Sequence, residues 1–366
     1  MNESALLDGA RAVAFQYVDP DRELTLRPLG QGLINDTFLV DDGRGLWVLQ
    51  RINPTVFRDP GAVISNLRLI LDHASRSLFL KPEEGWRLTN LLKTRSGLDF
   101  VLGADQSCWR AMVFLERTRT LEVLRSSEEA IEVGRALGWF HALMGDIDPS
   151  RLRDPLPGFH DTKRYVKNWD LAVTARSTPL DESTRALSDL IEGYRDRIGV
   201  FEAAVRAGLI SPAVTHGDPK LDNILFSEEG IRAVSLIDLD TVSSGLLHHD
   251  LGDCFRSSCN VGGEGEGGRS VHFDLKMFEA VLKGYLSNAR HLLKLTDLDF
   301  IYEATWLLPF ELGIRFLTDH LQGDLYFKAA YPGHNLKRAQ RQFDLVQSIE
   351  GQKALLMKIL HRQWLS

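Results

Sequence analysis

The spacing of hydrophobic residues divides the chain into a strand-rich beginning and a mostly helical remainder. Alternating or short apolar runs predict five strands, at residues 24–29, 37–40, 46–51, 86–92 and 108–115. One helix is predicted to begin at Pro60, because proline is favoured in the first turn of a helix and apolar residues recur at helical spacing after it. Strands with one helix after the third predict a small α+β unit.

Helical periodicity dominates the chain after about residue 127. It predicts helices at residues 130–144, 163–175, 182–206, 273–286, 298–319 and 335–360. Strand-like runs interrupt this pattern at residues 214–226 and 231–239, and the glycine-rich run at residues 262–268 predicts a mobile loop. The sequence therefore predicts a larger helical part that contains one island of strands.

Composition and charge exclude several classes of protein. With 366 residues, 44% of them hydrophobic and 25% charged, the chain is long enough for two domains or one two-lobed unit with a substantial core. The formal net charge is −7 and no long basic run occurs, which argues against binding to nucleic acid or to an anionic membrane. A phosphate ligand would therefore need local glycines, a few cations or a metal ion.

The N-terminus, the most apolar stretch and the cysteines together predict a cytoplasmic protein. The first residues lack the basic and apolar regions of a secretory signal. The stretch at residues 304–317 contains Pro309, Glu311 and Arg315, so it is too short and too charged to span a bilayer. Three cysteines in a chain of this length favour reduced thiols over a disulfide framework. The sequence leaves the oligomeric state open.

The strand island carries the clearest chemical pattern. Asp218 follows a His-Gly pair in a predicted tight turn, Asn223 comes five residues later, and Asp238 follows the next apolar strand. This spacing is typical of phosphoryl transfer, in which an aspartate accepts the proton of the attacking hydroxyl. Asn223 and Asp238 offer hard oxygen ligands for Mg²⁺, and Lys220 could reach the transferring phosphate. A surface turn is the alternative for Asp218 alone, and the combined pattern argues against it.

These motifs resemble the His-Gly-Asp loop and the Ile-Asp metal motif of the aminoglycoside phosphotransferase and choline kinase superfamily. Within it, the chain is similar to the N-acetylhexosamine 1-kinases, which phosphorylate the anomeric hydroxyl of N-acetylglucosamine or N-acetylgalactosamine. The similar blocks are residues 30–35, 48–53, 215–225, 237–241 and 315–336, and the resemblance runs from about residue 24 to 350.

The resemblance implies an α+β, protein-kinase-like fold with two lobes. The small antiparallel-sheet lobe, residues 1–116, would bind the nucleotide, and the mostly helical lobe, residues 117–366, would carry catalysis and bind the substrate. ATP would be the phosphoryl donor and Mg²⁺ the cofactor. Asp218 and Lys220 would be catalytic, and Asn223, Asp238 and Asp240 would hold the metal, although Asp240 could equally hold the site together.

The nucleotide site implied by the resemblance departs from the usual kinase pattern. Its residues would be Gly30, Gly32, Asn35, Gln50, Phe114 and Glu116. The two glycines let backbone N–H groups approach phosphates, although a plain hairpin turn would also use them. The third strand should offer a lysine to the α- and β-phosphates, but Gln50 stands there, and the next helix offers no clear glutamate partner. The run from Phe114 to Glu116 would form the hinge between the lobes, with backbone groups available to an adenine, or would simply end a strand.

The substrate side depends on the C-terminal block. By resemblance, Arg315 and Tyr326 would bind the sugar together with Asp218, whereas the alternative for Arg315 is a structural pair with an acidic residue. Leu33 stands where the similar kinases have a histidine implicated in substrate binding, so the choice of sugar is open. Asp250, near two histidines, is expected to anchor the catalytic loop rather than bind zinc.

The sequence leaves three hypotheses for the function. The leading one is a sugar 1-kinase, and the nearest rival is a kinase for another hydroxyl acceptor of the aminoglycoside, choline or homoserine type. A non-catalytic nucleotide-binding scaffold is the third, and the presence of base, lysine and both metal ligands argues against it. A sulfatase is excluded, because no cysteine or serine begins the Cys-x-Pro-x-Arg or Ser-x-Pro-x-Arg pattern that a formylglycine site needs.

Overall fold

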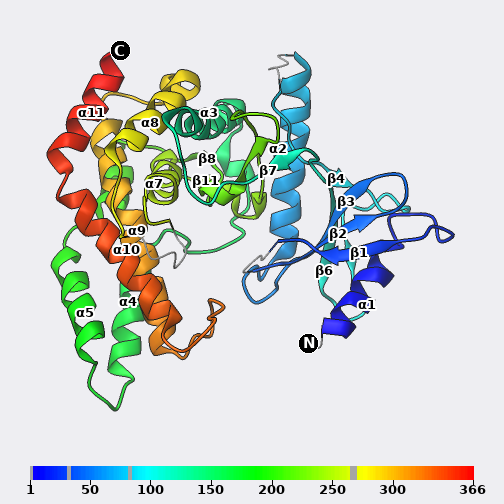
Figure 1. Ribbon diagram of the computed structural model, residues 1–366, viewed down its shortest axis with the longest axis horizontal. Helices are drawn as coiled ribbons and strands as arrows, with labels where there is room; N and C mark the ends of the chain where they lie inside the picture. The colour runs from blue at the N-terminus through cyan, green and yellow to red at the C-terminus, as the bar shows by residue number, and fades with distance from the viewer. Residues whose placement is uncertain (1–2, 31–33, 81–84, 264–269) are drawn as a thin grey trace. The chain divides into compact units, whose positions relative to one another are not determined.

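The computed structural model describes residues 3–30, 34–80, 85–263 and 270–366 (Figure 1). The chain forms two compact units. The first unit comprises Met1–Thr118, Ser150–Pro157 and Ile237–Ser243, and the second comprises Arg119–Pro149, Gly158–Leu236 and Ser244–Ser366. The first unit therefore contains two segments from beyond residue 116.

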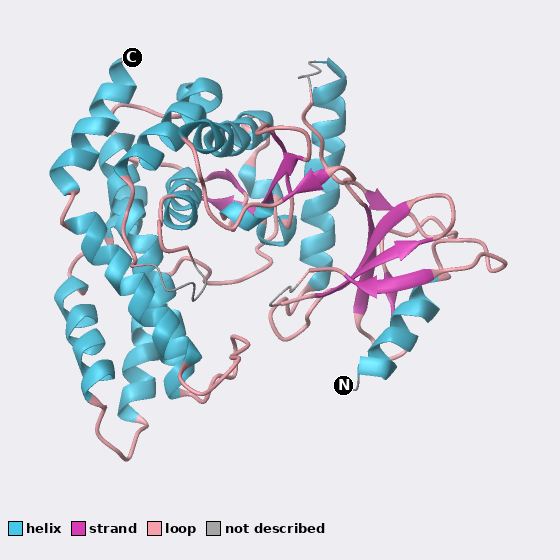
Figure 2. Ribbon diagram, viewed as in Figure 1, coloured by secondary structure: helices cyan, strands magenta, loops and turns pink. Residues whose placement is uncertain are grey.

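An antiparallel sheet forms the centre of the first unit (Figure 2). Its strands are β1 (Thr25–Pro28), β2 (Asp36–Asp41), β3 (Leu46–Arg51), β4 (Leu91–Leu92), β5 (Val101–Leu102) and β6 (Cys108–Val113). They lie in the order β1-β2-β3-β6-β4, and β5 also pairs with β6. Helix α1 (Glu3–Ala14) buries Ala10 and Val13 against Phe38, Leu49 and Trp109 of the sheet. This apolar layer fixes the register of β2, β3 and β6.

Helix α2 (Pro60–Leu80) explains why distant segments belong to the first unit. The buried amide nitrogen of Asn66 donates to the carbonyl oxygens of Arg153 (2.7 Å) and Val242 (2.9 Å), and its oxygen accepts from the N–H of Arg153 (2.9 Å). Those partners lie beside the short helices η1 (Pro149–Arg151) and η3 (Leu239–Thr241). One amide side chain thus holds both returning segments of the chain.

The second unit is built around two closely packed groups of helices. Helix α3 (Ser127–Met144) packs against α8 (Leu275–Ala289) with almost no side chain between their backbones, because a Cβ at Gly134 would lie 1.9 Å from the carbonyl oxygen of Val281. Helix α9 (Asp297–Leu321) contacts α4 (Thr162–Thr174), α7 (Leu247–Ser258), α10 (His334–Glu350) and α11 (Lys353–Leu365).

Short strands interrupt the helices of the second unit, as the sequence predicts. Strand β9 (Ile224–Ser227) pairs with β10 (Ala233–Leu236) in an antiparallel hairpin that joins Ile224 to Leu236. Strands β8 (Ala213–Thr215) and β11 (Ser243–Gly245) form a separate pair, and β7 (Thr118–Arg119) lies where the chain passes between the units. The turn between β8 and β9 carries the chemical pattern.

The predicted fold class is confirmed: a small antiparallel sheet precedes a larger, mostly helical part. Two predicted helices are wrong in length, because residues 182–206 form α5 (Glu182–Tyr194) and α6 (Val200–Arg206), and residues 335–360 break at Gly351 between α10 and α11. Helices α1 and α7 are not predicted. Among the helices of the described residues, none combines the length and apolarity needed to cross a bilayer.

Candidate active site

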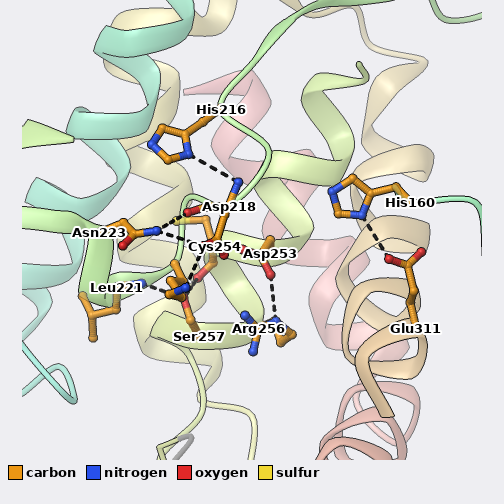
Figure 3. A network of polar contacts seen from close by, with 11 residues as sticks. His160, His216, Asp218, Leu221, Asn223, Asp253, Cys254, Arg256, Ser257 and Glu311 are labelled. Carbon is orange, nitrogen blue, oxygen red and sulfur yellow. Dashed lines mark hydrogen bonds and ion pairs between the residues drawn. The ribbon is translucent and has the colours of Figure 1, made fainter. Parts of the chain in front are cut away.

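The turn after β8 presents Asp218 with one carboxylate oxygen held and the other open (Figure 3). Gly217 has φ +85°, a left-handed conformation that glycine adopts without strain, and it lets the chain reverse just before Asp218. The Oδ2 atom of Asp218 accepts from Lys220 Nζ (2.6 Å) and from Asn223 Nδ2 (3.1 Å). No described residue donates to Oδ1, so this oxygen can accept the proton of a hydroxyl group.

Asp250 of α7 holds this turn in place by hydrogen bonds, as the sequence predicts. Its Oδ2 accepts from the N–H of His216 (2.6 Å), its Oδ1 accepts from the N–H of Gly217 (2.9 Å), and His141 of α3 donates to Oδ2 (2.8 Å). Burial alone would raise the pKa of Asp250, but the hydrogen bonds from His141 and Gly217 hold that pKa below its usual value. Asp250 is therefore ionised at neutral pH and fixes two backbone amides beside Asp218.

Two further contacts that support the turn are not predicted from the sequence. Tyr285 of α8 donates to the second ring nitrogen of His141 (3.0 Å), which orients that imidazole toward Asp250. Ser257 of α7 accepts from the N–H of Leu221 (3.0 Å). His141 and Tyr285 lie on apolar helix faces far from the turn in sequence, so no local pattern identifies them.

The metal-binding role predicted for Asn223 and Asp238 stays a prediction, and each residue is described within its own unit. Asn223 Nδ2 donates to the backbone oxygen (2.8 Å) and to Oδ2 of Asp218. Because both partners are acceptors, the amide nitrogen is fixed on that side and Asn223 Oδ1 points away from it, available to a cation. Asp238, in the first unit, follows the end of β10 by two residues and has a left-handed backbone (φ +62°).

A magnesium ion needs few protein ligands, because it takes one or two side-chain oxygens and completes its shell with water and phosphate oxygens. The described residues contain no group of three or more His, Cys, Asp or Glu side chains that could hold a metal. A closed zinc-type site is therefore not formed by this part of the chain. His248, one of the two histidines before Asp250, instead pairs with Asp297 (2.8 Å).

Asp240 has both carboxylate oxygens engaged within the first unit. Its Oδ2 accepts from Asn35 Nδ2 (2.7 Å), and its Oδ1 forms a close ion pair with Arg110. Because Asp240 is buried and its oxygens hold two side chains of the sheet region, the geometry favours the structural one of its two predicted roles. Asp240 ties the segment Ile237–Ser243 to the sheet.

Two of the predicted nucleotide-binding residues, Asn35 and Gln50, have side chains that already bind protein partners. Gly30 has a left-handed backbone (φ +70°), and Gly32 and Leu33 lie outside the described residues, as does most of the predicted loop at residues 262–268. Asn35 Oδ1 accepts from the N–H of Asn53 (2.9 Å). Gln50 Nε2 donates to Thr37 (3.1 Å) and its Oε1 accepts from Arg110.

The predicted hinge lies just after β6. Phe114 is half-buried and Glu116 is exposed. The carbonyl oxygen of Glu116 accepts a hydrogen bond from Arg87 (3.1 Å). Their assignment to adenine binding stays a prediction.

Arg315 of α9 lies among aromatic rings rather than beside an acid. Its guanidinium carbon is 5.2 to 5.9 Å from the ring centres of Phe159, Tyr165, Tyr326 and Phe327. No carboxylate of the described residues lies within ion-pair distance of Arg315, which argues against the structural pair considered from the sequence. Arg315 and Tyr326 thus lie in the same aromatic cluster. We call Arg315 and its four aromatic neighbours the arginine cage.

A neighbouring acid on α9 is paired elsewhere. Glu311 accepts from the ring of His160 (3.1 Å) and from the hydroxyl of Thr162 (2.9 Å). Burial alone would lower the pKa of His160, but the charge of Glu311 raises it above its usual value. The carboxylate of Glu311 thus has its hydrogen bonds with His160 and Thr162 rather than with Arg315, although its charge helps to raise the pKa of Arg315.

The loop that carries Tyr326 is fixed by two buried side chains. Asp319 accepts from the N–H groups of Tyr326 (2.7 Å) and Phe327 (2.9 Å), and Asn335 donates to Asp319 (3.0 Å). Asn335 therefore shapes the loop. His334 does the same through its ring, which accepts from the N–H of Ala330 (3.0 Å).

Several solved structures share the fold of the chain. An aminoglycoside phosphotransferase from Alicyclobacillus acidocaldarius is 16% identical to the chain, covers 96% of each chain and has a TM-score of 0.64. A choline kinase from Cryptosporidium parvum is 13% identical, covers 100% of each chain and has a TM-score of 0.57. A spectinomycin phosphotransferase in complex with ADP and spectinomycin is 13% identical, covers 94% of this chain and 99% of that chain, and has a TM-score of 0.53. At such low identity these likenesses show the shared kinase-like fold.

The family itself is shown by the sequence comparison. Residues 25–281, more than half of the chain, match the profile of the phosphotransferase enzyme family. An aminoglycoside phosphotransferase and a choline kinase share the fold of the chain, and the profile match shows that the chain belongs to the phosphotransferase enzyme family.

Proposed function

We propose that the protein is an ATP- and Mg²⁺-dependent kinase that phosphorylates the anomeric hydroxyl of an N-acetylhexosamine or a related sugar. The observation that carries the proposal is the Asp218 carboxylate, which Lys220 and Asn223 hold by one oxygen while the other is open. The ADP in the complex of the spectinomycin phosphotransferase supports an adenine nucleotide as donor. In this proposal residues 1–116 bind the nucleotide and residues 117–366 provide the base and the acceptor site.

Asp218 is the general base of the proposed reaction. Its Oδ1 accepts the proton as the sugar hydroxyl attacks the γ-phosphorus, and the bond from that phosphorus to the β–γ bridging oxygen breaks, so that ADP leaves. Asp250 keeps the turn in place by its two amide contacts. Lys220, with Nζ 2.6 Å from the carboxylate, is close enough to exchange that contact for an oxygen of the transferring phosphoryl group. Such reactions depend on positioning and on charge stabilisation, which is what these fixed contacts supply.

The metal would be held by Asn223 Oδ1 and by the carboxylate of Asp238. When bound, Mg²⁺ neutralises charge on the phosphate oxygens. The orientation of the Asn223 amide, set by its two contacts with Asp218, supports this assignment. Asp240 is left out of the ligand set because its oxygens already bind Asn35 and Arg110.

The arginine cage supports an uncharged acceptor. A cationic acceptor such as choline or an aminoglycoside would be repelled by Arg315, whose charge already occupies the space among the aromatic rings. An acetamido carbonyl can instead accept a hydrogen bond from the guanidinium, and a sugar ring can pack on Tyr326. These features favour an N-acetylated sugar over the rival acceptors.

An ADP-release assay over a panel of acceptors tests the proposed function. The panel is N-acetylglucosamine, N-acetylgalactosamine, glucosamine, glucose, galactose, kanamycin, choline and homoserine, each with ATP and Mg²⁺. We expect the highest kcat/KM with an N-acetylated hexosamine and no turnover after chelation of the metal. Turnover restricted to a cationic acceptor would overturn the sugar assignment, and no turnover with any hydroxyl acceptor would favour the scaffold.

A matched pair of variants tests the base. Asp218→Asn should lower kcat by about 10² to 10⁴-fold and leave ADP binding largely intact, because the amide cannot accept the proton. Asp222→Asn makes the same change of charge at an exposed position of the same turn and should leave kcat within about threefold. Full activity of the Asp218→Asn variant would refute the assignment.

A further inference from the structure

A buried arginine lies where the first unit is expected to receive phosphate. Arg110 of β6 is 1% exposed and stands directly opposite Gln50 of β3 in the sheet register. Its Nε donates to Gln50 Oε1 (3.1 Å), and its NH2 atom donates to the same oxygen and to Asp240. Its third nitrogen, NH1, is buried and has no hydrogen-bond partner among the described residues.

The unpartnered nitrogen is not explained by a structural ion pair. Arginine stays charged when it is buried, and its guanidinium has five N–H groups that need acceptors. Gln50 and Asp240 satisfy the groups on Nε and NH2 only. A buried donor without an acceptor lowers stability, so NH1 indicates an acceptor that the protein itself does not provide.

Arg110 is placed to supply the positive charge that position 50 of the third strand lacks, since Gln50 stands where kinases have a lysine for the α- and β-phosphates. Protein kinases contact the α- and β-phosphates with a cation on the third strand, and a carboxylate from another element holds that cation. Here the third strand offers Gln50, which is neutral. Arg110 faces the same side of the sheet, because opposite residues of an antiparallel pair share a face. Asp240 then acts as the carboxylate partner, from a segment 130 residues away in sequence.

We propose that Arg110 is the phosphate-binding cation of the nucleotide site in the first unit. Gln50 and Asp240 fix the guanidinium, and NH1 donates to an α- or β-phosphate oxygen of a nucleoside triphosphate. This inference rests on the proposed function, since it requires a nucleotide donor. Because protein atoms cover NH1, a bound phosphate must displace what covers it. The competing role is a brace that only holds Asp240 and its segment to the sheet.

The two roles differ in which part of the nucleotide they affect. A phosphate contact strengthens binding of ADP but not of adenosine, which has no phosphate, whereas loss of a brace distorts the site and weakens both. The experiment measures ADP binding by calorimetry with Mg²⁺ present, and adenosine binding by displacement of ADP. It compares wild type, Arg110→Met and Arg110→Lys, each below the temperature at which it begins to melt.

Arg22→Met is the matched control. Arg22 also lies in the first unit and forms a short ion pair, with Asp42 (2.8 Å), but it does not contact Gln50 or Asp240. We expect it to leave the affinities for ADP and for adenosine unchanged.

The expected result is a selective loss. Arg110→Met should weaken ADP binding about 10- to 100-fold, the range for a hydrogen bond to a charged group, and should change adenosine binding less than about threefold. Arg110→Lys keeps the charge and should lose less of the ADP affinity. If Arg110→Met does not fold, the same comparison of ADP and adenosine binding is made with Arg110→Lys. Unchanged ADP binding, or an equal loss for ADP and adenosine, would overturn the inference and leave the proposed function standing. A wild-type protein that binds no ADP would overturn both.

Discussion

Asp250 is the residue whose replacement most directly tests how the catalytic turn is held. In Asp250→Asn, an amide nitrogen replaces one carboxylate oxygen. If it replaces Oδ1, it faces the N–H of Gly217; if it replaces Oδ2, it faces the N–H of His216 and the ring of His141. In either orientation at least one hydrogen bond is lost and a buried donor meets another donor.

The size of the effect follows from these contacts. A hydrogen bond to a charged group contributes about 1.5–3 kcal/mol, and a buried donor left unsatisfied costs about 1–3 kcal/mol. We therefore expect the free energy of unfolding to fall by about 3–5 kcal/mol. Because His216 and Gly217 directly precede Asp218, a shift of the turn by about 1 Å should also lower kcat about 10²-fold.

Urea denaturation and ADP-release kinetics measure the two effects, with kcat corrected for the folded fraction. Asp297→Asn is the matched control, since Asp297 is also buried and accepts from a histidine, His248 (2.8 Å), and from a backbone N–H, that of Lys294 (2.5 Å). It should lose comparable stability and keep kcat within about threefold. An Asp250→Asn variant with wild-type kcat, or an equal loss of kcat in both variants, would refute the reasoning.

Three further predictions follow from other contacts. Asp319→Asn should raise the KM for the acceptor about tenfold with kcat within about threefold, because the new amide nitrogen would face the N–H of Tyr326 or that of Phe327, and either clash disturbs the loop that carries Tyr326; unchanged steady-state kinetics would contradict this. Gly284→Ala should lower the free energy of unfolding by at least about 1–3 kcal/mol, because its Cβ would lie 2.0 Å from a carbonyl oxygen of α3, whereas Gly193→Ala, with no atom within 4 Å, should be neutral or stabilising in the same thermal melts. The pKa of Asp250 is lower in the folded protein, so its contribution to stability is present above the ordinary aspartate value of about 3.9 and is lost as the pH falls through its folded value; the gap in urea midpoint between wild type and Asp250→Asn should shrink at low pH.

The sequence alone predicts the elements and the catalytic turn, because both depend on neighbouring residues. The period of the apolar residues predicts β2, β3, α2 and most helices of the second unit. Asp218, Lys220 and Asn223 lie within six positions of one another, so a short turn brings them together whatever surrounds it. The breaks that divide residues 182–206 and 335–360 are not marked by a proline, and tertiary packing decides them.

Contacts between distant residues are decided only by the tertiary structure. Arg110 and Asp240 are 130 residues apart. The sheet register that places Arg110 opposite Gln50 cannot be predicted from the sequence of either strand alone. The rings around Arg315 come from α4, from the segment before it and from the loop after α9. A local pattern reports which residue types are present, but which charges share a buried space depends on how the whole chain packs, and that packing fixes their partners and their pKa values.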